Sequence, residues 1–316
     1  MQNYCRGELR SSVSGIFDRF AKTEPITYGW SGDKKYCVES ADGTKYFLRI
    51  SSHEQYDNRK ALFEMKKQVA VLGVPMCLPI EVGSCDDGVF TLDSWIDGRD
   101  LRECWAELSE QRQYELGVQS GRYLRKIHSI PAPVNIENWS VQYNRKTDLK
   151  IQKYHDCGLR FNGDEHILRY IEQNRHLLEN RPQCFQHGDF HEGNMMLANN
   201  SELVIIDFDR YSFGDPWEEF NRITWSAKAS PHFASGQLNG YFNGAPPLAF
   251  FETLAFYIAV GTLAHLPWAI KFGQDEVDIA LGLSQEVLRW YDDMRNVVPT
   301  WYNAELTMQN AELGNV

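Results

Sequence analysis

The pattern of apolar and polar positions divides the chain into a strand-rich first part and a helical second part. Alternating aromatic and β-branched residues in the segment 26–50, interrupted by glycines and by the pair Asp42 and Gly43, predict three short antiparallel strands. Apolar residues at helical spacing then predict a helix that stops at Gly73. The segment 76–98 predicts two further strands, so a five-stranded sheet with one helix is expected.

The periodicity becomes helical after this first part. Apolar residues three and four positions apart predict helices in the segments 115–130, 164–180 and 248–294. The exception is 195–208, where two apolar runs flank an Asn-Asn-Ser turn and predict a β-hairpin. We therefore expect an α+β protein with two lobes, residues 1–95 and residues 96–316.

Composition and charge narrow the possible functions. The chain has 316 residues, 43% of them hydrophobic, which is typical of a globular protein. Its formal net charge of -11 disfavours binding to nucleic acid or to an anionic membrane. We see no signal peptide and no apolar run of about 18 residues, so a cytoplasmic protein is expected. The seven cysteines include no CxxC pair and are expected to be reduced.

The stretch QHGDFHEGNMML, residues 186–197, concentrates polar side chains directly before the predicted hairpin. His187 and His191 have the spacing of two zinc ligands on one face of a helix. Gly188 and Asp189 between them are poor helix formers, however, and the glutamate follows the second histidine instead of the first. A polar loop with satisfied histidines is the plainest alternative.

A third interpretation uses the hairpin as well. Asn194 follows Asp189 by five positions, and the hairpin brings Asp207 to the end of an apolar strand. Phosphoryl transfer needs a carboxylate beside the attacking hydroxyl and oxygen ligands for Mg²⁺, because most of its barrier is charge and positioning. In this interpretation Asp189 is the base, and Asn194 and Asp207 are the metal ligands.

These motifs resemble the aminoglycoside phosphotransferase family, the small-molecule branch of the protein-kinase-like fold. The family's HGDxHxxN loop, its IDxD strand and its GDP motif match His187, Gly188, Asp189, His191, Asn194, Asp207, Asp209 and residues 214–216. The resemblance implies a bilobal fold, with an N-terminal nucleotide-binding lobe and a C-terminal catalytic and substrate-binding lobe. It also implies Mg²⁺ and either ATP or GTP as cofactors.

This chain differs from the family at the lysine of the third strand. The corresponding segment, KYFLRI, offers Arg49, which keeps the positive charge but has a planar, forked geometry. Lys45 in the same strand is the alternative. The expected partner of Arg49 is Glu64, the acid inside the helix that follows, although a solvated glutamate on a polar face is the plainer interpretation.

Two further nucleotide contacts are expected. The glycine-containing turn around Ser31 and Gly32 could bring backbone N–H groups to the phosphates, although the same residues suit an ordinary hairpin turn. The resemblance implies that backbone groups of Ser94 and Ile96 contact the adenine.

The acceptor is less well defined by the sequence. Asp292 and Asp293 lie near the end of a predicted helix, where acids oppose the helix dipole, and could bind a cationic substrate. Nearby aromatic residues, including Trp301 and Tyr302, could present ring faces to it, although core packing is the commoner role of such residues. Because of the net charge of -11, a neutral or cationic acceptor is expected.

The leading hypothesis is therefore an O-phosphotransferase that acts on a small molecule, with an aminoglycoside or another antibiotic as the first expectation. The resemblance also allows a metabolite kinase acting on choline, homoserine, fructosamine or methylthioribose. A nucleotide-binding pseudokinase that scaffolds a partner is the alternative outside the enzymes, since Arg49 replaces the family lysine.

Overall fold

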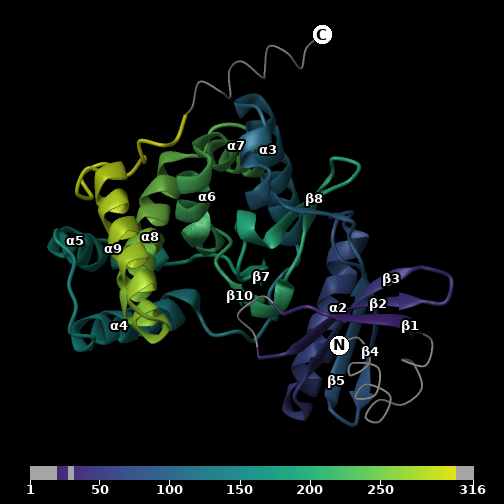
Figure 1. Cartoon of the computed structure of the whole chain (residues 1–316). Helices are drawn as coiled ribbons and strands as arrows, with labels where there is room; N and C mark the ends of the chain where they lie inside the picture. The colour runs from purple at the N-terminus through teal and green to yellow at the C-terminus, as the bar shows by residue number, and fades with distance from the viewer. Residues whose placement is uncertain (1–19, 28–31, 304–316) are drawn as a thin grey trace. The chain divides into compact units, whose positions relative to one another are not determined.

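The computed structural model of the chain describes residues 20–27 and 32–303 (Figure 1). These residues form two compact units. Unit 1 contains the described residues up to Asp100 together with Met195–Asp209, and unit 2 contains Leu101–Asn194 and the described residues from Arg210 onward. The predicted hairpin, assigned by sequence to the C-terminal lobe, thus groups with the strand-rich unit.

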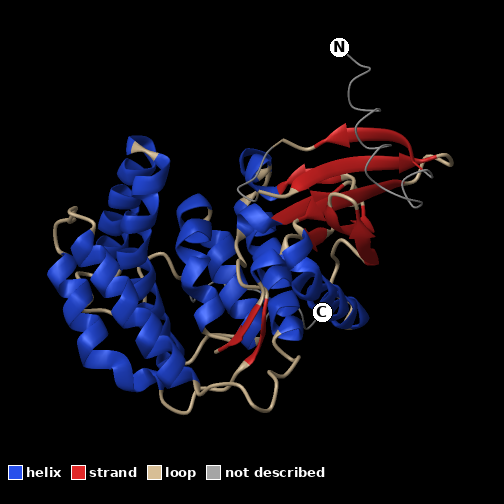
Figure 2. Ribbon diagram, turned by 90° about the horizontal axis from the view of Figure 1, so that it is seen from below, coloured by secondary structure: helices blue, strands red, loops and turns tan. Residues whose placement is uncertain are grey.

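Unit 1 is built on the predicted five-stranded antiparallel sheet, drawn in red in Figure 2. The strands lie in the order β1-β2-β3-β5-β4, with the bounds β1 Phe20–Pro25, β2 Lys34–Ser40, β3 Lys45–Ser51, β4 Pro79–Cys85 and β5 Gly88–Ser94. Val38, Leu48 and Phe90 lie in the apolar cluster that β2, β3 and β5 bury on one face.

The first strand differs from its prediction. It ends at Pro25, where a strand from Ile26 was expected, and Pro25 is paired with Tyr36 of β2. The reason is that β1 is an edge strand whose side chains are mostly exposed, so apolar alternation does not mark it. Of the rest of the expected strand, residues 28–31 lie outside the described residues.

The remaining elements of unit 1 agree with the prediction. Helix α2 spans Tyr56–Val71 and packs against β4 and β5, and Gly73 follows it with a φ of 68°, the left-handed conformation of a helix end. The predicted hairpin forms β8, Met195–Ala198, and β9, Leu203–Ile205, and β8 also pairs with the short strand β6, Gly98–Asp100.

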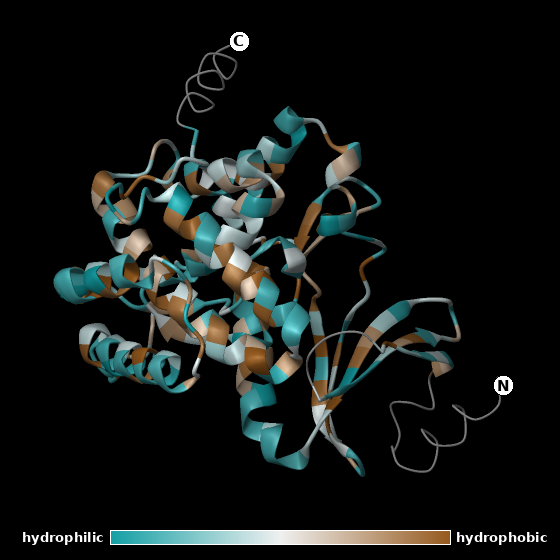
Figure 3. Cartoon of the chain, turned by 60° about the vertical axis from the view of Figure 1, so that its left-hand side comes forward, coloured by the Kyte–Doolittle hydropathy of each residue, from teal (hydrophilic) through white to brown (hydrophobic). Residues whose placement is uncertain are grey.

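Unit 2 is mostly helical, as predicted. Its helices are α3 Glu110–Ile127, α4 Trp139–Asp156, α5 Asp164–Asn174, α6 Ile223–Ala229, α7 Pro231–Phe242, α8 Leu248–Ala269 and α9 Gln274–Trp290. Two short strands, β7 Cys184–Gln186 and β10 Ser212–Gly214, form a separate antiparallel pair. Short 3-10 helices include η6 Glu192–Asn194 and η8 Glu218–Arg222. Most helices carry both apolar (brown) and polar (teal) residues, as Figure 3 shows.

Helix α8 is the exception, because it is apolar around its whole circumference. The segment Leu248–Phe272 is long and apolar enough to cross a membrane by composition, which the sequence interpretation had excluded. It is the one such helix in the described part of the chain, and 67% of its apolar window is buried. Fully buried residues such as Leu254, Phe256 and Leu263 identify it as the core helix of unit 2.

Helices α3 and α7 approach each other at glycines. A Cβ atom at Gly117 or Gly121 of α3 would lie 2.1 or 2.0 Å from a carbonyl oxygen of α7. Conversely, a Cβ atom at Gly236 or Gly240 of α7 would lie 2.2 Å from a carbonyl oxygen of α3. The four glycines therefore allow backbone to pack directly on backbone between these helices.

Candidate active site

Arg49 of β3 is the central cation of unit 1. Its side chain is buried, and its Nη1 atom lies 3.1 Å from Asp33 Oδ2 and in close contact with Asp209. Its Nη2 atom lies 3.8 Å from Asp207 Oδ1. Lys45, the alternative cation, is largely exposed and lies 3.9 Å from Asp97. Of the two candidates, Arg49 is thus the one beside Asp207.

The predicted pairing of Arg49 with Glu64 is wrong. Glu64 is exposed and accepts a hydrogen bond of 3.1 Å from Lys67 of the same helix. The buried side of α2 carries Arg59 and Lys66, seven positions apart, and Glu64 lies well around the helix from both. This helix therefore presents cations where a carboxylate was expected.

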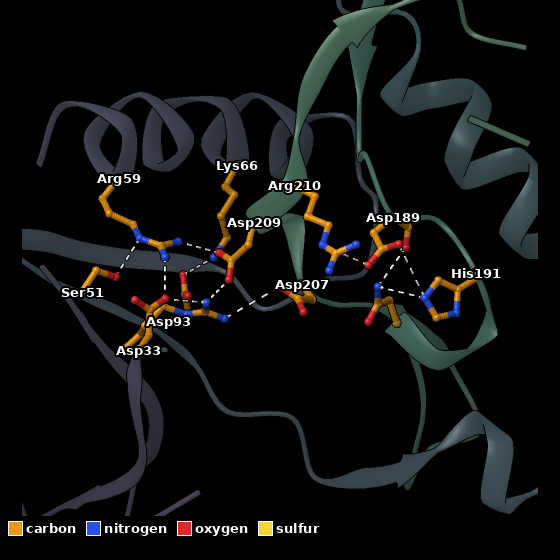
Figure 4. Close-up of polar contacts among 12 residues, drawn as sticks. Asp33, Ser51, Arg59, Lys66, Asp93, Asp189, His191, Asp207, Asp209 and Arg210 are labelled. Atoms are coloured by element: carbon orange, nitrogen blue, oxygen red, sulfur yellow. Dashed lines mark hydrogen bonds and ion pairs between the residues drawn. The ribbon is translucent and has the colours of Figure 1, made fainter. Parts of the chain in front are cut away.

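Arg59 is bonded to the same carboxylates as Arg49. Its Nη2 lies 2.6 Å from Asp33 Oδ2, its Nη1 lies 2.6 Å from Asp209 Oδ1, and its Nε donates to Ser51 Oγ at 2.8 Å (Figure 4). Arg49, Asp33, Arg59 and Asp209 thus form a closed ring of alternating charge. Burial, followed by the neighbouring Arg49, lowers the pKa of Arg59 from its usual value.

Asp207 follows β9 and has a left-handed backbone, with a φ of 62°. Its carboxylate is 42% exposed, so it is less committed to protein contacts than Asp33 or Asp209. A carboxylate with free oxygens is the donor that Mg²⁺ prefers, and Asp207 therefore fits a metal ligand.

The groups expected near the nucleotide base also belong to unit 1. A cavity of about 240 Å³ is lined by eight residues that include Ile26, Cys37 and Trp95. The backbone N–H of Ser94 donates to Leu78 O, so only its carbonyl is left for a base. Ile96 makes no hydrogen bond within the described residues, which leaves both of its backbone groups available. Of the turn expected at the phosphates, Ser31 lies outside the described residues, and Gly32 is exposed with open space around it.

The loop that carries Asp189 begins in unit 2, directly after β7. Gly188 has a φ of 85°, and a Cβ atom there would lie 1.8 Å from the carbonyl oxygen of Arg210. The N–H of Gly188 donates to Oε1 of the buried Glu219 at 2.9 Å. Backbone packing on one side and a carboxylate on the other thus determine where the loop places Asp189.

The carboxylate of Asp189 is surrounded by basic side chains. Arg222 Nε lies 2.8 Å from its Oδ1 and Arg210 Nε lies 3.7 Å from its Oδ2. The contact with Arg222 lacks hydrogen-bond geometry, so among the described residues Oδ1 has no hydrogen-bond partner. Oδ1 is buried against Arg222, so Oδ2, whose contact with Arg210 is 3.7 Å long, is the oxygen that fits an acceptor of a proton from a ligand.

Asn194, at the end of η6, has a defined side-chain orientation. Its Nδ2 donates to the backbone carbonyl of Asp189 at 2.8 Å. Because the nitrogen is used inside the loop, Oδ1 faces away from that carbonyl and is the atom left for a cation. An amide oxygen suits Mg²⁺, so Asn194, like Asp207, fits the expected ligand.

The zinc interpretation fails. Residues 187–191 form a loop, and no group of three or more His, Cys, Asp or Glu side chains in the described ranges is arranged to hold a metal. His191 packs its ring edge on Trp225 at 4.8 Å, and burial lowers its pKa to about 4. Its imidazole is therefore neutral near pH 7.

Several functional side chains were missed from the sequence. Arg59, Asp33 and Arg222 lie far along the chain from the oppositely charged side chains that they contact, and no local motif marks them. Glu219 has a usable signal, because it lies three positions after the GDP motif. In that motif, the fully buried Asp215 binds Arg181, Tyr257 and the N–H of Trp217, so its carboxylate is used inside unit 2.

The expected acceptor residues do not form an open aromatic wall. Trp301 is buried, and Tyr302 donates a hydrogen bond to Asn239 and packs on Phe251. The interpretation of these rings as a substrate wall is wrong, because the segment after α9 folds back over α7 and α8 as part of the core. Asp292 and Asp293 are exposed and share Arg295, and their role in acceptor binding stays a prediction.

Comparisons with known proteins identify the family and the fold. The model of the family described as "Phosphotransferase enzyme family" matches residues 22–251. A comparison with curated protein sequences finds no match.

Similar solved structures include ADP-bound aminoglycoside phosphotransferase APH(2'')-Ib, with 18% identity, 85% of this chain and 95% of that chain covered, and a TM-score of 0.60. Amicoumacin kinase hAmiN in complex with AMP-PNP, Ca²⁺ and Ami has 15% identity, with 89% of this chain and 91% of that chain covered, and a TM-score of 0.61. Aminoglycoside phosphotransferase APH(4)-Ia with ADP and hygromycin B has 16% identity, coverage of 90% and 97%, and a TM-score of 0.60.

At these identities the structures show a shared fold, and this fold is the predicted one. The family model covers well over half of the chain and ends inside α8, so it includes the loop with Asp189 and the hairpin with Asp207. The chain therefore belongs to the phosphotransferase enzyme family, with the kinase-like fold of the aminoglycoside phosphotransferases.

Proposed function

We propose that this protein transfers the γ-phosphate of ATP or GTP to a hydroxyl group of a small molecule. The observation that carries the proposal is the loop 187–194, where Asp189 keeps an unbonded carboxylate oxygen and Asn194 is held by the backbone of Asp189. In this proposal Asp189 accepts the proton of the attacking hydroxyl, and Gly188 and Glu219 determine its position.

The nucleotide is proposed to bind the described groups of unit 1. Arg49 contacts the phosphates through its Nη2 end, whose charged neighbour among the described residues is Asp207 at 3.8 Å. The base occupies the cavity lined by Ile26, Cys37 and Trp95, with the N–H of Ile96 and the carbonyl of Ser94 as its backbone partners.

Asn194 and Asp207 are proposed to hold Mg²⁺. When bound, the ion neutralises charge on the phosphate oxygens and aligns them for transfer. Support comes from the donor atoms: an amide oxygen turned away from its own loop and a half-exposed carboxylate.

The acceptor is proposed to be a neutral or cationic small molecule. Similar solved structures are complexes with gentamicin, hygromycin B or Ami, which favours an antibiotic as the first class to test. The metabolite kinases of choline, homoserine, fructosamine and methylthioribose type are the second class. Arg210 and Arg222 beside Asp189 add local positive charge, so both neutral and charged acceptors belong in the test.

A turnover screen tests the proposal. The protein is incubated with Mg²⁺, ATP or GTP and one acceptor at a time, drawn from aminoglycosides, macrolides, peptide antibiotics, amino alcohols and sugars. Mass spectrometry should find one acceptor heavier by a phosphate group, with the matching nucleoside diphosphate released. Tight nucleotide binding without any phosphorylated product, over a panel that broad, would favour the pseudokinase alternative.

A further inference from the structure

The two arginines of unit 1 are not equivalent. All three nitrogens of the Arg59 guanidinium are engaged inside the unit, by Ser51, Asp33 and Asp209. In Arg49 the ring contacts are both made by Nη1, and Nη2 has no hydrogen bond among the described residues. Arg59 is therefore the inner, fully committed cation, and Arg49 has an end that can bind an anion.

The shared carboxylates connect these two roles. Asp33 Oδ2 lies 2.6 Å from Arg59 and 3.1 Å from Arg49, and Asp209 uses one oxygen for each arginine. Movement of Arg59 would therefore release both carboxylates, and Arg49 would lose the contacts that determine its rotamer. Figure 4 shows Arg59 between Asp33 and Asp209, with Ser51 on its other side.

The charge balance leads to the same conclusion. With both arginines present, Asp33, Asp207 and Asp209 carry three negative charges against two positive ones. Without Arg59 the same carboxylates keep Arg49 and the electrostatic attraction of Lys35, which acts on Asp207 and Asp33. The excess negative charge would repel the phosphate oxygens of the nucleotide.

We propose that Arg59 is a positioning residue for the nucleotide phosphates: through Asp33 and Asp209 it orients Arg49 and offsets the charge of the acids. The proposal rests on the proposed function, because it concerns the same nucleotide site. Glu64 of α2 was expected to orient Arg49 directly. In this proposal Arg59 of α2 does so instead, through Asp209, which contacts both arginines.

A purely structural role is the competing explanation, in which Arg59 only attaches α2 to the sheet. The same helix contains a matched control. Lys66, seven positions after Arg59, is also largely buried and is paired with Asp93 of β5. Its removal breaks a comparable contact between helix and sheet without a direct effect on the ring.

The experiment compares the affinity for ATP and for adenosine, with Mg²⁺ present, in the wild-type protein, Arg59→Gln and Lys66→Gln. If GTP is the donor, GTP and guanosine replace them. Loss of one charge-assisted contact is typically worth about tenfold in affinity. Arg59→Gln should therefore weaken ATP binding by about tenfold or more and leave adenosine binding within about twofold. Lys66→Gln should change both affinities by one common factor.

Arg59→Lys provides a second, milder variant. A lysine keeps the charge but reaches fewer ring atoms than a guanidinium, so ATP affinity should fall between the wild-type value and that of Arg59→Gln. If Arg59→Gln does not fold, a selective loss of ATP affinity in Arg59→Lys decides the question.

Two outcomes would overturn the proposal. Either Arg59 variants weaken ATP and adenosine equally, as Lys66→Gln does, or they leave ATP affinity unchanged. A failure of the proposed function is distinguishable, because the wild-type protein itself would then bind neither ATP nor GTP.

Discussion

Replacing Gly188 by alanine isolates the effect of loop geometry on Asp189. The backbone there has a φ of 85°, and this left-handed conformation of an alanine lowers the free energy of unfolding by about 1 to 2 kcal/mol. Its Cβ would also lie 1.8 Å from the carbonyl oxygen of Arg210, where ordinary contact begins at 3.4 Å. The loop or the segment at Arg210 must therefore shift by more than about 1 Å, and such overpacking costs about 1 to 3 kcal/mol more.

The shift should affect turnover more than binding. Asp189 follows Gly188 directly and Arg210 is one of its basic neighbours, so both ends of that contact move. A misplacement of about 1 Å in an active site can cost about 10²-fold in rate. We expect Gly188→Ala to lower kcat by about 10²-fold and the free energy of unfolding by about 2 to 5 kcal/mol.

Gly158 provides the matched control. It lies in the same unit and has a φ of 76°, but no atom lies within 4 Å of a Cβ built there. Gly158→Ala should therefore show the conformational cost alone, about 1 to 2 kcal/mol, with unchanged kcat. The assay pairs urea unfolding with steady-state turnover for both variants. If Gly188→Ala loses no more activity than Gly158→Ala, the loop does not position the base.

Three further predictions concern the metal, the core of unit 2 and its response to pH. Asp207→Ala should abolish the Mg²⁺ dependence of nucleotide affinity, and an unchanged magnesium titration would remove its assignment as a ligand. Gly121→Ala should destabilise the packing of α3 on α7 by more than about 1 kcal/mol, whereas Gly282→Ala, in open space on α9, should stabilise the protein by up to about 1 kcal/mol. Burial raises the pKa of Glu218 above its usual value of 4.5, so the folded state holds the carboxyl proton of Glu218 more tightly than the unfolded state does. The protein therefore loses stability as the pH rises from 4.5 through the raised pKa. The unfolding free energy of Glu218→Gln relative to wild type should therefore increase as the pH rises above about 4.5, and a pH-independent difference would contradict this assignment.

Local patterns predicted those elements whose apolar faces are regular. Helix α2 stops at Gly73, and the hairpin of β8 and β9 turns at an Asn-Asn-Ser sequence, as expected from neighbouring residues alone. Strand β1 was misplaced because its exposed edge position removes the alternation on which such predictions depend. Helix α8 shows the opposite problem, since burial on all sides leaves no polar face to distinguish it from a spanning helix.

The site could be predicted only where its residues are close in sequence. Asp189 and Asn194 lie in one loop, and their spacing was sufficient to predict that they lie together. The partner of Arg49 could not be predicted, because the ring depends on Arg59 meeting an aspartate 150 positions further along the chain. The prediction that the aromatic residues after α9 line a pocket failed for a related reason. Sequence spacing does not distinguish a ring in the core from one that lines a pocket.

The most direct test of the account follows the γ-phosphate itself. Wild-type protein and Asp189→Asn are each mixed with γ-labelled nucleotide, Mg²⁺ and an acceptor identified by the screen, and the labelled acceptor is measured with time. We predict that the wild-type protein labels the acceptor. Asp189→Asn should bind nucleotide within a few-fold of wild type and transfer the label at least about 10²-fold more slowly, the usual loss when a general base is removed. Transfer by Asp189→Asn at a rate close to that of the wild type would contradict the assignment of Asp189 as the base.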